Sequence, residues 1–301
     1  MEIVWHPAFP VDVRRTLAPL ARGRHDPTHQ VAADGALWRT TCTPDGPATY
    51  RLTQRGLQEV HAQAWGDGAA WVLERVPDLL GGRDSTDGFV AGHPLLAQVQ
   101  ARHPGLRIPR TGRVFEALVP AVLEQKVTGR EARSAFQFLV RRYGEPAPGP
   151  APAGMRVPPP PQVWGLVPSW EWHRAGVDGS RSATVMRAVS YAGRLEQCAD
   201  LPVEAARARM QAIPGIGVWT SAEVAARSLG DADAVSYGDF HVASNVVFAL
   251  TGETDGTDER LAELLEPWAG HRGRVVRLVE LTGISRPARG PRYSPLDFRR
   301  R

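Results

Sequence analysis

The 301-residue chain contains only two cysteines, a single lysine and no long apolar run. Cys42 and Cys198 are too few for a zinc site or a four-cysteine iron–sulfur cluster, so we expect no metal and no cofactor. No apolar stretch approaches the roughly 18–20 residues that cross a bilayer, so we expect no membrane span. The first residues lack the basic start and apolar core of a signal peptide, and we expect a cytoplasmic protein in a reducing compartment.

Lysine is scarce and arginine takes its place. Lys126 is the only lysine among 36 Lys and Arg residues, and the formal charge of the whole chain is only +4. The segment 271–301 nevertheless holds nine arginines against two acidic residues, Glu280 and Asp297, a net charge of +7. Such a basic segment suits contact with phosphates, although charge alone fits a solvated surface equally well.

Residues 1–90 have the pattern of a small mixed α/β domain. Residues 36–43 and 48–54 alternate in hydrophobicity as strands do, on either side of a Pro-Asp-Gly-Pro turn. A short helix with Asp12 as its N-cap precedes these strands, and a second helix over residues 68–82 follows them. The polar connection that comes next is the expected domain boundary.

Residues 91–301 are predicted to form a larger all-α region, which makes the chain an α+β protein. Apolar residues recur at three- and four-residue spacing in seven segments: 94–105, 113–144, 180–197, 202–213, 218–230, 240–252 and 258–270. We expect a kink or break near Pro120. The proline-rich segment 145–162 can be neither helix nor sheet on this pattern, and we expect a surface loop there.

The most specific local motif is Ile-Pro-Gly-Ile-Gly-Val-Trp at residues 213–219, between two amphipathic helices. Gly215 and Gly217 permit a tight turn, and Ile216 between them can pack between the two helices. The amides from Val218 onward begin a helix, and a helix N-terminus can bind a backbone phosphate. This is the helix–hairpin–helix pattern of DNA-binding proteins. The alternative is an ordinary turn between two helices, in which glycine only ends the first helix.

Asp239 follows Gly217 by 22 residues and directly precedes the predicted helix 240–252. Aspartate is favoured at helix N-caps, so Asp239 can simply be a cap. It can also be a catalytic carboxylate. The two roles are compatible, because a capping carboxylate is held rigidly in place.

Together these motifs resemble the helix–hairpin–helix DNA glycosylase superfamily, and within it the bacterial inducible 3-methyladenine DNA glycosylases. The resemblance runs through residues 6–23, 102–128, 172–185, 213–230 and 234–244. It implies a monomeric, monofunctional enzyme of base excision repair that acts on double-stranded DNA containing damaged bases. Such an enzyme flips an alkylated base, of the 3-methyladenine or 7-methylguanine type, out of the duplex and hydrolyses its N-glycosidic bond. Asp239 would stabilise the oxocarbenium-like sugar of the transition state.

The resemblance also implies what surrounds the flipped base. Bifunctional members of the superfamily carry a lysine nucleophile just after the hairpin, where this chain has Trp219, so a hydrolase is favoured. Trp219 and Glu223 would line the base pocket, and for Trp219 a plain core position is the alternative. Glu223 departs from the family, which often has a tyrosine at this place.

The family's DNA wedge corresponds to the segment that contains Gln125, Lys126 and Thr128. Either Gln125 or Lys126 would fill the gap left by the flipped base, and a polar turn between helices is the alternative. Arg272 would meet a phosphate or be solvated.

Two other functions stay open at this point. One is a non-catalytic helix–hairpin–helix protein that binds DNA or senses lesions. The other is a bifunctional glycosylase–lyase that uses Lys126 as its nucleophile.

Overall fold

The computed structural model describes residues 1–287. Its N-terminal part is a five-stranded antiparallel sheet in the order β1-β5-β4-β3-β2. The strands are β1 (Glu2–Trp5), β2 (His29–Val31), β3 (Leu37–Thr43), β4 (Gly46–Arg55) and β5 (Glu59–Trp65). The two strands expected from the sequence are confirmed as β3 and β4, which pair from Leu37↔Leu52 to Thr43↔Gly46 around the predicted turn.

Three helices and one short 3₁₀ helix accompany the sheet. α1 (Val13–Leu17) begins at its predicted cap, because the Asp12 carboxylate accepts a hydrogen bond from Arg15 N at 2.9 Å, and η1 (Ala18–Leu20) continues it. The prediction of a single helix over residues 68–82 is wrong, because the segment forms two helices, α2 (Ala69–Glu74) and α3 (Val76–Leu79), with Arg75 between them. Pro77 explains this break, since it has no amide to continue the hydrogen bonds of the preceding helix.

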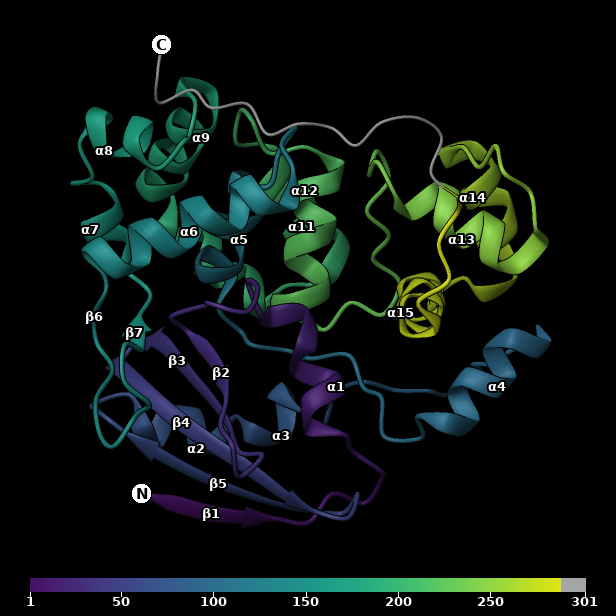
Figure 1. Cartoon of the computed structure of the whole chain (residues 1–301), viewed down its shortest axis with the longest axis horizontal. Coiled ribbons are helices and arrows are strands. Elements are labelled where there is room, and N and C mark those ends of the chain that lie inside the picture. The colour runs from purple at the N-terminus through teal and green to yellow at the C-terminus, as the bar shows by residue number, and fades with distance from the viewer. Residues whose placement is uncertain (288–301) are drawn as a thin grey trace.

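The rest of the described chain is mainly helical (Figure 1). Its helices are α4 (Pro94–Arg102), α5 (Val114–Leu123), α6 (Gly129–Tyr143), α7 (Pro161–Trp164), α8 (Ser169–Arg174), α9 (Gly179–Ser190), α10 (Ala192–Glu196), η2 (Gln197–Asp200), α11 (Val203–Gln211), α12 (Val218–Val224) with its π-helical end η3 (Ala225–Leu229), α13 (Val242–Thr251), α14 (Asp258–Leu265), η4 (Glu266–Trp268) and α15 (Arg272–Thr282). The α+β fold class is thus confirmed.

Two expectations for this region need correction. α5 continues through Pro120 and ends at Leu123, so the break lies at the following loop and not at the proline. The proline-rich segment is not purely loop, because β6 (Glu145–Pro146) pairs with β7 (Arg156–Val157). Met155 and Val157 are buried, and Met155 packs with Trp38 of β3, so this segment covers part of the sheet. Proline is tolerated in a two-stranded ribbon, where its missing amide costs little.

The buried apolar side chains form three large clusters. One lies in residues 11–80, between the sheet and α1–α3, and a second spans residues 114–234. The third combines α4 with α13–α15, which lie side by side in Figure 1 although most of the chain separates them in sequence. The domain boundary near residue 90 stays a prediction. The first part of the basic segment forms α15, and its residues 288–301 lie outside the described residues.

Within residues 1–287, no helix is long and apolar enough to cross a membrane. Both cysteines are free thiols. In the same residues, no group of three or more His, Cys, Asp and Glu side chains is arranged to hold a metal ion.

Candidate active site and DNA interface

The hairpin between α11 and α12 has the tight turn that its glycines predict. Gly215 has a φ of +96°, and a β-carbon added there would lie 2.3 Å from Thr184 Oγ1 of α9, so only glycine fits. Ile216 is 4% exposed and belongs to the helical core. Gly217 is the N-cap of α12, and no side chain caps the helix there. The first amides of α12 therefore lie at an uncapped helix start beside the exposed Val218.

Asp239 lies in the loop that leads into α13, opposite the first turn of α12. Its Oδ1 accepts hydrogen bonds from the backbone amides of His241 at 2.8 Å and Val242 at 3.1 Å. Its Oδ2 accepts a hydrogen bond from Trp219 Nε1 at 3.2 Å. The expected N-cap position of Asp239 is wrong by two residues, since His241 is the N-cap of α13 and no side chain caps that helix. Asp239 instead accepts from the amides of the N-cap residue and of the first helical residue, and its carboxylate is also fixed against the half-buried Trp219.

The loop between α5 and α6 presents Lys126 at its tip. Lys126 is exposed and has a φ of +57°, the only positive φ at a non-glycine residue within residues 1–287. Gln125 points the other way: its side-chain amide donates to Gly215 O at 2.9 Å and to Thr220 Oγ1 at 2.8 Å. Thr128 is the N-cap of α6 and forms a capping box with Glu131. We name residues 124–128 the wedge loop.

Glu223 lies one helical turn beyond Trp219 on the same face of α12. One carboxylate oxygen accepts a hydrogen bond from Ser236 Oγ at 2.5 Å, and the other pairs with Arg227 Nη1 at 2.8 Å. Burial raises the pKa of Glu223, but the charge of Arg227, the hydrogen bond from Ser236 and the charge of Arg22 outweigh it, so the pKa lies below its ordinary value of 4.5. Glu223 is therefore ionised at neutral pH.

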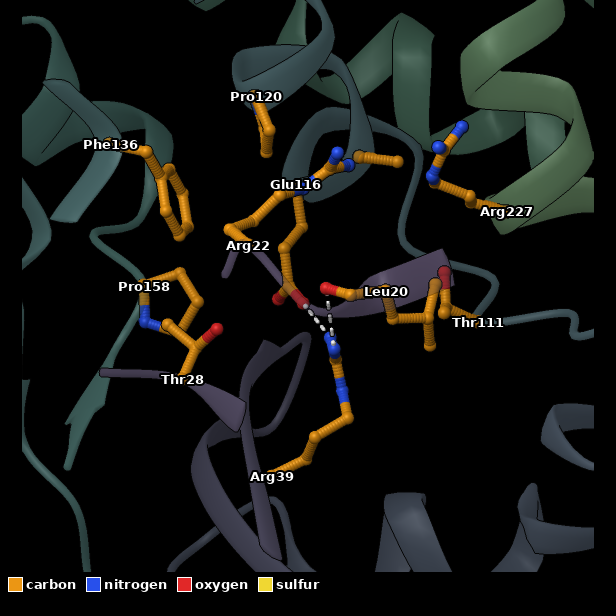
Figure 2. A pocket seen from close by; sticks show the side chains of 11 residues that line it. Leu20, Arg22, Thr28, Arg39, Thr111, Glu116, Pro120, Phe136, Pro158 and Arg227 are labelled. Atoms are coloured by element: carbon orange, nitrogen blue, oxygen red, sulfur yellow. Dashed lines mark hydrogen bonds and ion pairs between the residues drawn. The ribbon is translucent and has the colours of Figure 1, made fainter. Parts of the chain in front are cut away.

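A second buried ion pair lies close to the first. Arg22, from the segment after η1, pairs with Glu124 of the wedge loop at 2.9 Å, while Arg227 Nε donates to Pro19 O at 3.0 Å. Figure 2 shows Arg22 and Arg227 at a small cavity of about 30 Å³ between the sheet and α5, where Arg39 donates to Glu116 and to Leu20 O. The N-terminal segment, the wedge loop and α12 thus meet through charged side chains.

Comparisons with known proteins give one similarity in sequence and several in fold. No family model matches the chain. The probable bifunctional transcriptional activator/DNA repair enzyme AlkA of Mycobacterium tuberculosis is 35% identical over 143 residues, which is 47% of this chain and 28% of that protein. The chain thus spans little more than a quarter of that relative's length.

Several solved structures cover nearly the whole chain. The 3-methyladenine DNA glycosylase of Archaeoglobus fulgidus matches with a TM-score of 0.76 at 16% identity, over 93% of this chain and 97% of its own. The Clostridium acetobutylicum 8-oxoguanine glycosylase/lyase, in complex with double-stranded DNA containing cytosine opposite 8-oxoguanine, matches with a TM-score of 0.68 at 9% identity, over 93% and 98%. This chain therefore shares the fold of these two glycosylases.

Within this glycosylase fold, Arg272 begins α15 and is bound to Asp233. Its backbone N and its Nε both donate to Asp233 Oδ1 at 2.9 Å, and its Nη2 lies 2.8 Å from Asp233 Oδ2. The side chain is about one-third exposed, so it is neither free nor buried. Its neighbour Arg274 is buried and paired with Asp84. The structure thus places Arg272 near the start of the loop that carries Asp239.

Several residues at this glycosylase-fold site escaped the sequence analysis. Arg22, Glu124, Arg227 and Ser236 showed no motif, and Arg22 lies about two hundred residues before Arg227 in the chain. The one usable signal was the spacing of Trp219, Glu223 and Arg227, since residues four apart share a helix face.

Proposed function

We propose that the protein is a DNA glycosylase of base excision repair that hydrolytically releases alkylated bases of the 3-methyladenine and 7-methylguanine type. The observation that carries this proposal is the fixed carboxylate of Asp239, held between Trp219 Nε1 and the first amides of α13 beside the hairpin. The fold is shared by glycosylases for different bases, so the choice of alkylated bases rests on the sequence similarity to AlkA and on Trp219.

The proposed mechanism begins with DNA binding. The uncapped amides after Gly217 bind a backbone phosphate, and Lys126 fills the gap in the duplex while its ammonium reaches a phosphate. Gln125 is the tether that holds the wedge loop to the hairpin, because both of its side-chain hydrogen bonds go to hairpin residues. Arg272 lies at the rim of the site, where a phosphate would compete with Asp233 for its guanidinium.

The flipped base then lies against Trp219 and Glu223. An alkylated purine carries positive charge, so the electron-rich indole face of Trp219 favours it. The N-glycosidic bond breaks with its electron pair going to the base, which neutralises the base and makes it a good leaving group. Asp239 stabilises the positive charge that develops on the sugar, and it orients the water whose oxygen bonds to C1′ and whose proton it accepts.

Asp239→Asn tests the proposal. We expect the variant to bind methylated duplex DNA as the wild type does and to lose release of 3-methyladenine and 7-methylguanine, by at least about a hundredfold. Base release is measured by chromatography of the freed bases, and binding by fluorescence anisotropy. A wild-type protein that binds DNA but frees no base from any alkylated duplex would contradict the enzyme and favour a lesion-sensing protein.

One observation favours a second candidate. The chain's sole lysine is exposed at the tip of the wedge loop, so a lyase step through Lys126 deserves a direct test. We expect no covalent adduct when the wild type is incubated with an abasic-site duplex and borohydride. An adduct that disappears in Lys126→Arg would replace the hydrolase by a bifunctional glycosylase–lyase.

A further inference from the structure

An open groove of about 650 Å³ lies between the N-terminal segment and the C-terminal end of α6. Its polar lining consists of Arg14, Arg24, His25, His29, Gln30 and Arg141. Among the described residues that line it, none is acidic. The groove is therefore a concave surface of one charge sign, which favours an anionic partner.

The positive charge of this groove is not neutralised within residues 1–287. Arg14, Arg24 and Arg141 are exposed and form no ion pair with a described residue, whereas many other arginines of the molecule do. Three acidic residues near the groove in sequence are already occupied: Asp12 pairs with Arg15, Asp26 accepts from the backbone amides of Arg22 and Thr28, and Asp34 pairs with Arg51.

The two histidines of the groove differ in exposure, because His25 is exposed and His29 is buried. Burial and the charge of Arg39 lower the pKa of His29 to about 3, so His29 is neutral. His29 thus adds no positive charge to that of the arginines.

The groove is continuous with the wedge loop through α6. Arg133 lies one turn into α6, and its Nε donates to Gly129 O at 2.7 Å. The same side chain lies against Gly23, which lines the groove. Gln137 Nε2 then donates to Arg22 O at 2.8 Å, and Arg141 donates to His25 O one turn later.

The cationic side chains between the wedge loop and the groove are exposed, and they form no ion pair with a described residue. They begin with Lys126 and continue with Arg130 and Arg133, and none of the three forms an ion pair within the described part of the chain. Figure 1 shows α6 crossing above the sheet from the side of α5 toward β6. The unpaired cations therefore form one path, from the wedge loop to the groove.

We infer that this path, Lys126–Arg130–Arg133–Arg24–Arg141, binds the phosphates of one arm of the duplex beyond the damaged base. The inference rests on the proposed function, in which the wedge loop inserts into DNA. α6 rises by about 18 Å between Gly129 and Arg141, which corresponds to about five base pairs of duplex. The N-terminal part of the molecule is then part of the DNA footprint, and affinity depends on the length of one arm only.

The test measures affinity for duplexes that contain a stable abasic analogue, with one arm of about three or about ten base pairs, in both orientations. On one side of the lesion, we expect the wild type to bind the duplex with the long arm about tenfold more tightly than the duplex with the short arm. On the other side, the length of the arm should not change the affinity. The variant Arg24→Gln/Arg141→Gln should lose this gain, and its plot of log affinity against log salt should be shallower by about two.

The matched control is Arg102→Gln/Arg142→Gln, which removes two exposed, unpaired arginines that do not line the groove. It should behave as the wild type does.

The single variant Arg24→Gln, whose side chain makes no hydrogen bond with a described residue, should show half the change in salt slope even if the double variant folds poorly. Equal binding to both arm lengths, or equal effects of test and control variants, would overturn the inference; a wild type that binds no lesion duplex would instead overturn the proposed function.

Discussion

At the scale of single residues, the Asp239 carboxylate joins the start of α13 to α12. Its carboxylate accepts hydrogen bonds from the backbone amides of His241 and Val242 and from the Trp219 indole. A carboxylate held by three donors loses little conformational freedom when it acts on a substrate, which suits electrostatic stabilisation of a developing charge. The hydrogen bond also fixes the orientation of the Trp219 ring against the proposed base position.

The charge of Glu223 should make the free energy of unfolding depend on pH. Because its pKa in the folded protein lies below the ordinary 4.5, the ionised form stabilises the fold at neutral pH, and this stabilisation is lost as the pH falls below 4.5. Glu223→Gln should lower the free energy of unfolding at pH 7 by roughly 2 kcal/mol, since Arg227 loses its partner in a mostly buried pair. Urea unfolding at several pH values measures the difference, which should shrink toward pH 3.

Glu280→Gln is the control for this prediction. Glu280 pairs with Arg277 at 2.8 Å, but its side chain is half exposed, so its loss should change stability little at any pH. A difference between wild type and Glu223→Gln that stays constant from pH 7 to pH 3 would contradict the assigned charge state.

At the scale of elements, the hairpin depends on the turn at Gly215 more than on its second glycine. Alanine at Gly215 would be strained by the positive φ and would clash with Thr184, whereas alanine at Gly217 meets nothing within 4 Å. We expect Gly215→Ala to cost about 1–3 kcal/mol of stability and to weaken DNA binding, and Gly217→Ala to fold as the wild type does. Thermal unfolding and DNA anisotropy measure both; equal stability of the two variants would contradict this account.

The wedge loop is held where it leaves α5, which explains how it keeps an unfavourable backbone at Lys126. Arg181 Nη1 donates to Leu123 O at 2.8 Å, at the end of α5, and Arg22 holds Glu124 from the N-terminal segment. Gln125 binds the hairpin on the other side of the loop. A positive φ at a non-glycine residue costs free energy and persists only when neighbouring contacts hold it, so the wedge loop is preorganised to present Lys126.

At the scale of the whole molecule, one buried ion pair joins the polar connection after α3 to α15. Arg274 and Asp84 pair at 2.5 Å with side chains only 4% and 1% exposed, and Asp84 also accepts from Ile108 N at 2.9 Å. Arg274→Ala leaves a buried carboxylate without its cation. We expect a loss of about 3–5 kcal/mol in the free energy of unfolding, measured by urea titration.

The comparison for this prediction is Arg260→Ala. Arg260 pairs with Glu253 at 2.8 Å, but both side chains are more than one-third exposed, so the loss should stay below about 1 kcal/mol. Similar losses for the two variants would show that burial does not govern the contribution of the Arg274–Asp84 pair.

Local signals in the sequence predicted much of the secondary structure. The Asp12 cap, the turn between β3 and β4, and the hairpin glycines depend on backbone conformations and hydrogen bonds within a few residues, so spacing alone identifies them. The same local logic failed at Pro120, where α5 continues because tertiary packing of its buried face offsets the lost hydrogen bond.

The sequence by itself determined most of the helical segments, the hairpin and the position of Asp239 just before a helix, because each depends on neighbours in the chain. Only the tertiary structure decided which side chains meet: Trp219 with Asp239, Gln125 with the hairpin 90 residues away, and Arg22 with Glu124 across 102 residues. Such contacts depend on the path of the whole chain, which brings distant charged and polar groups into one buried environment where they must be paired.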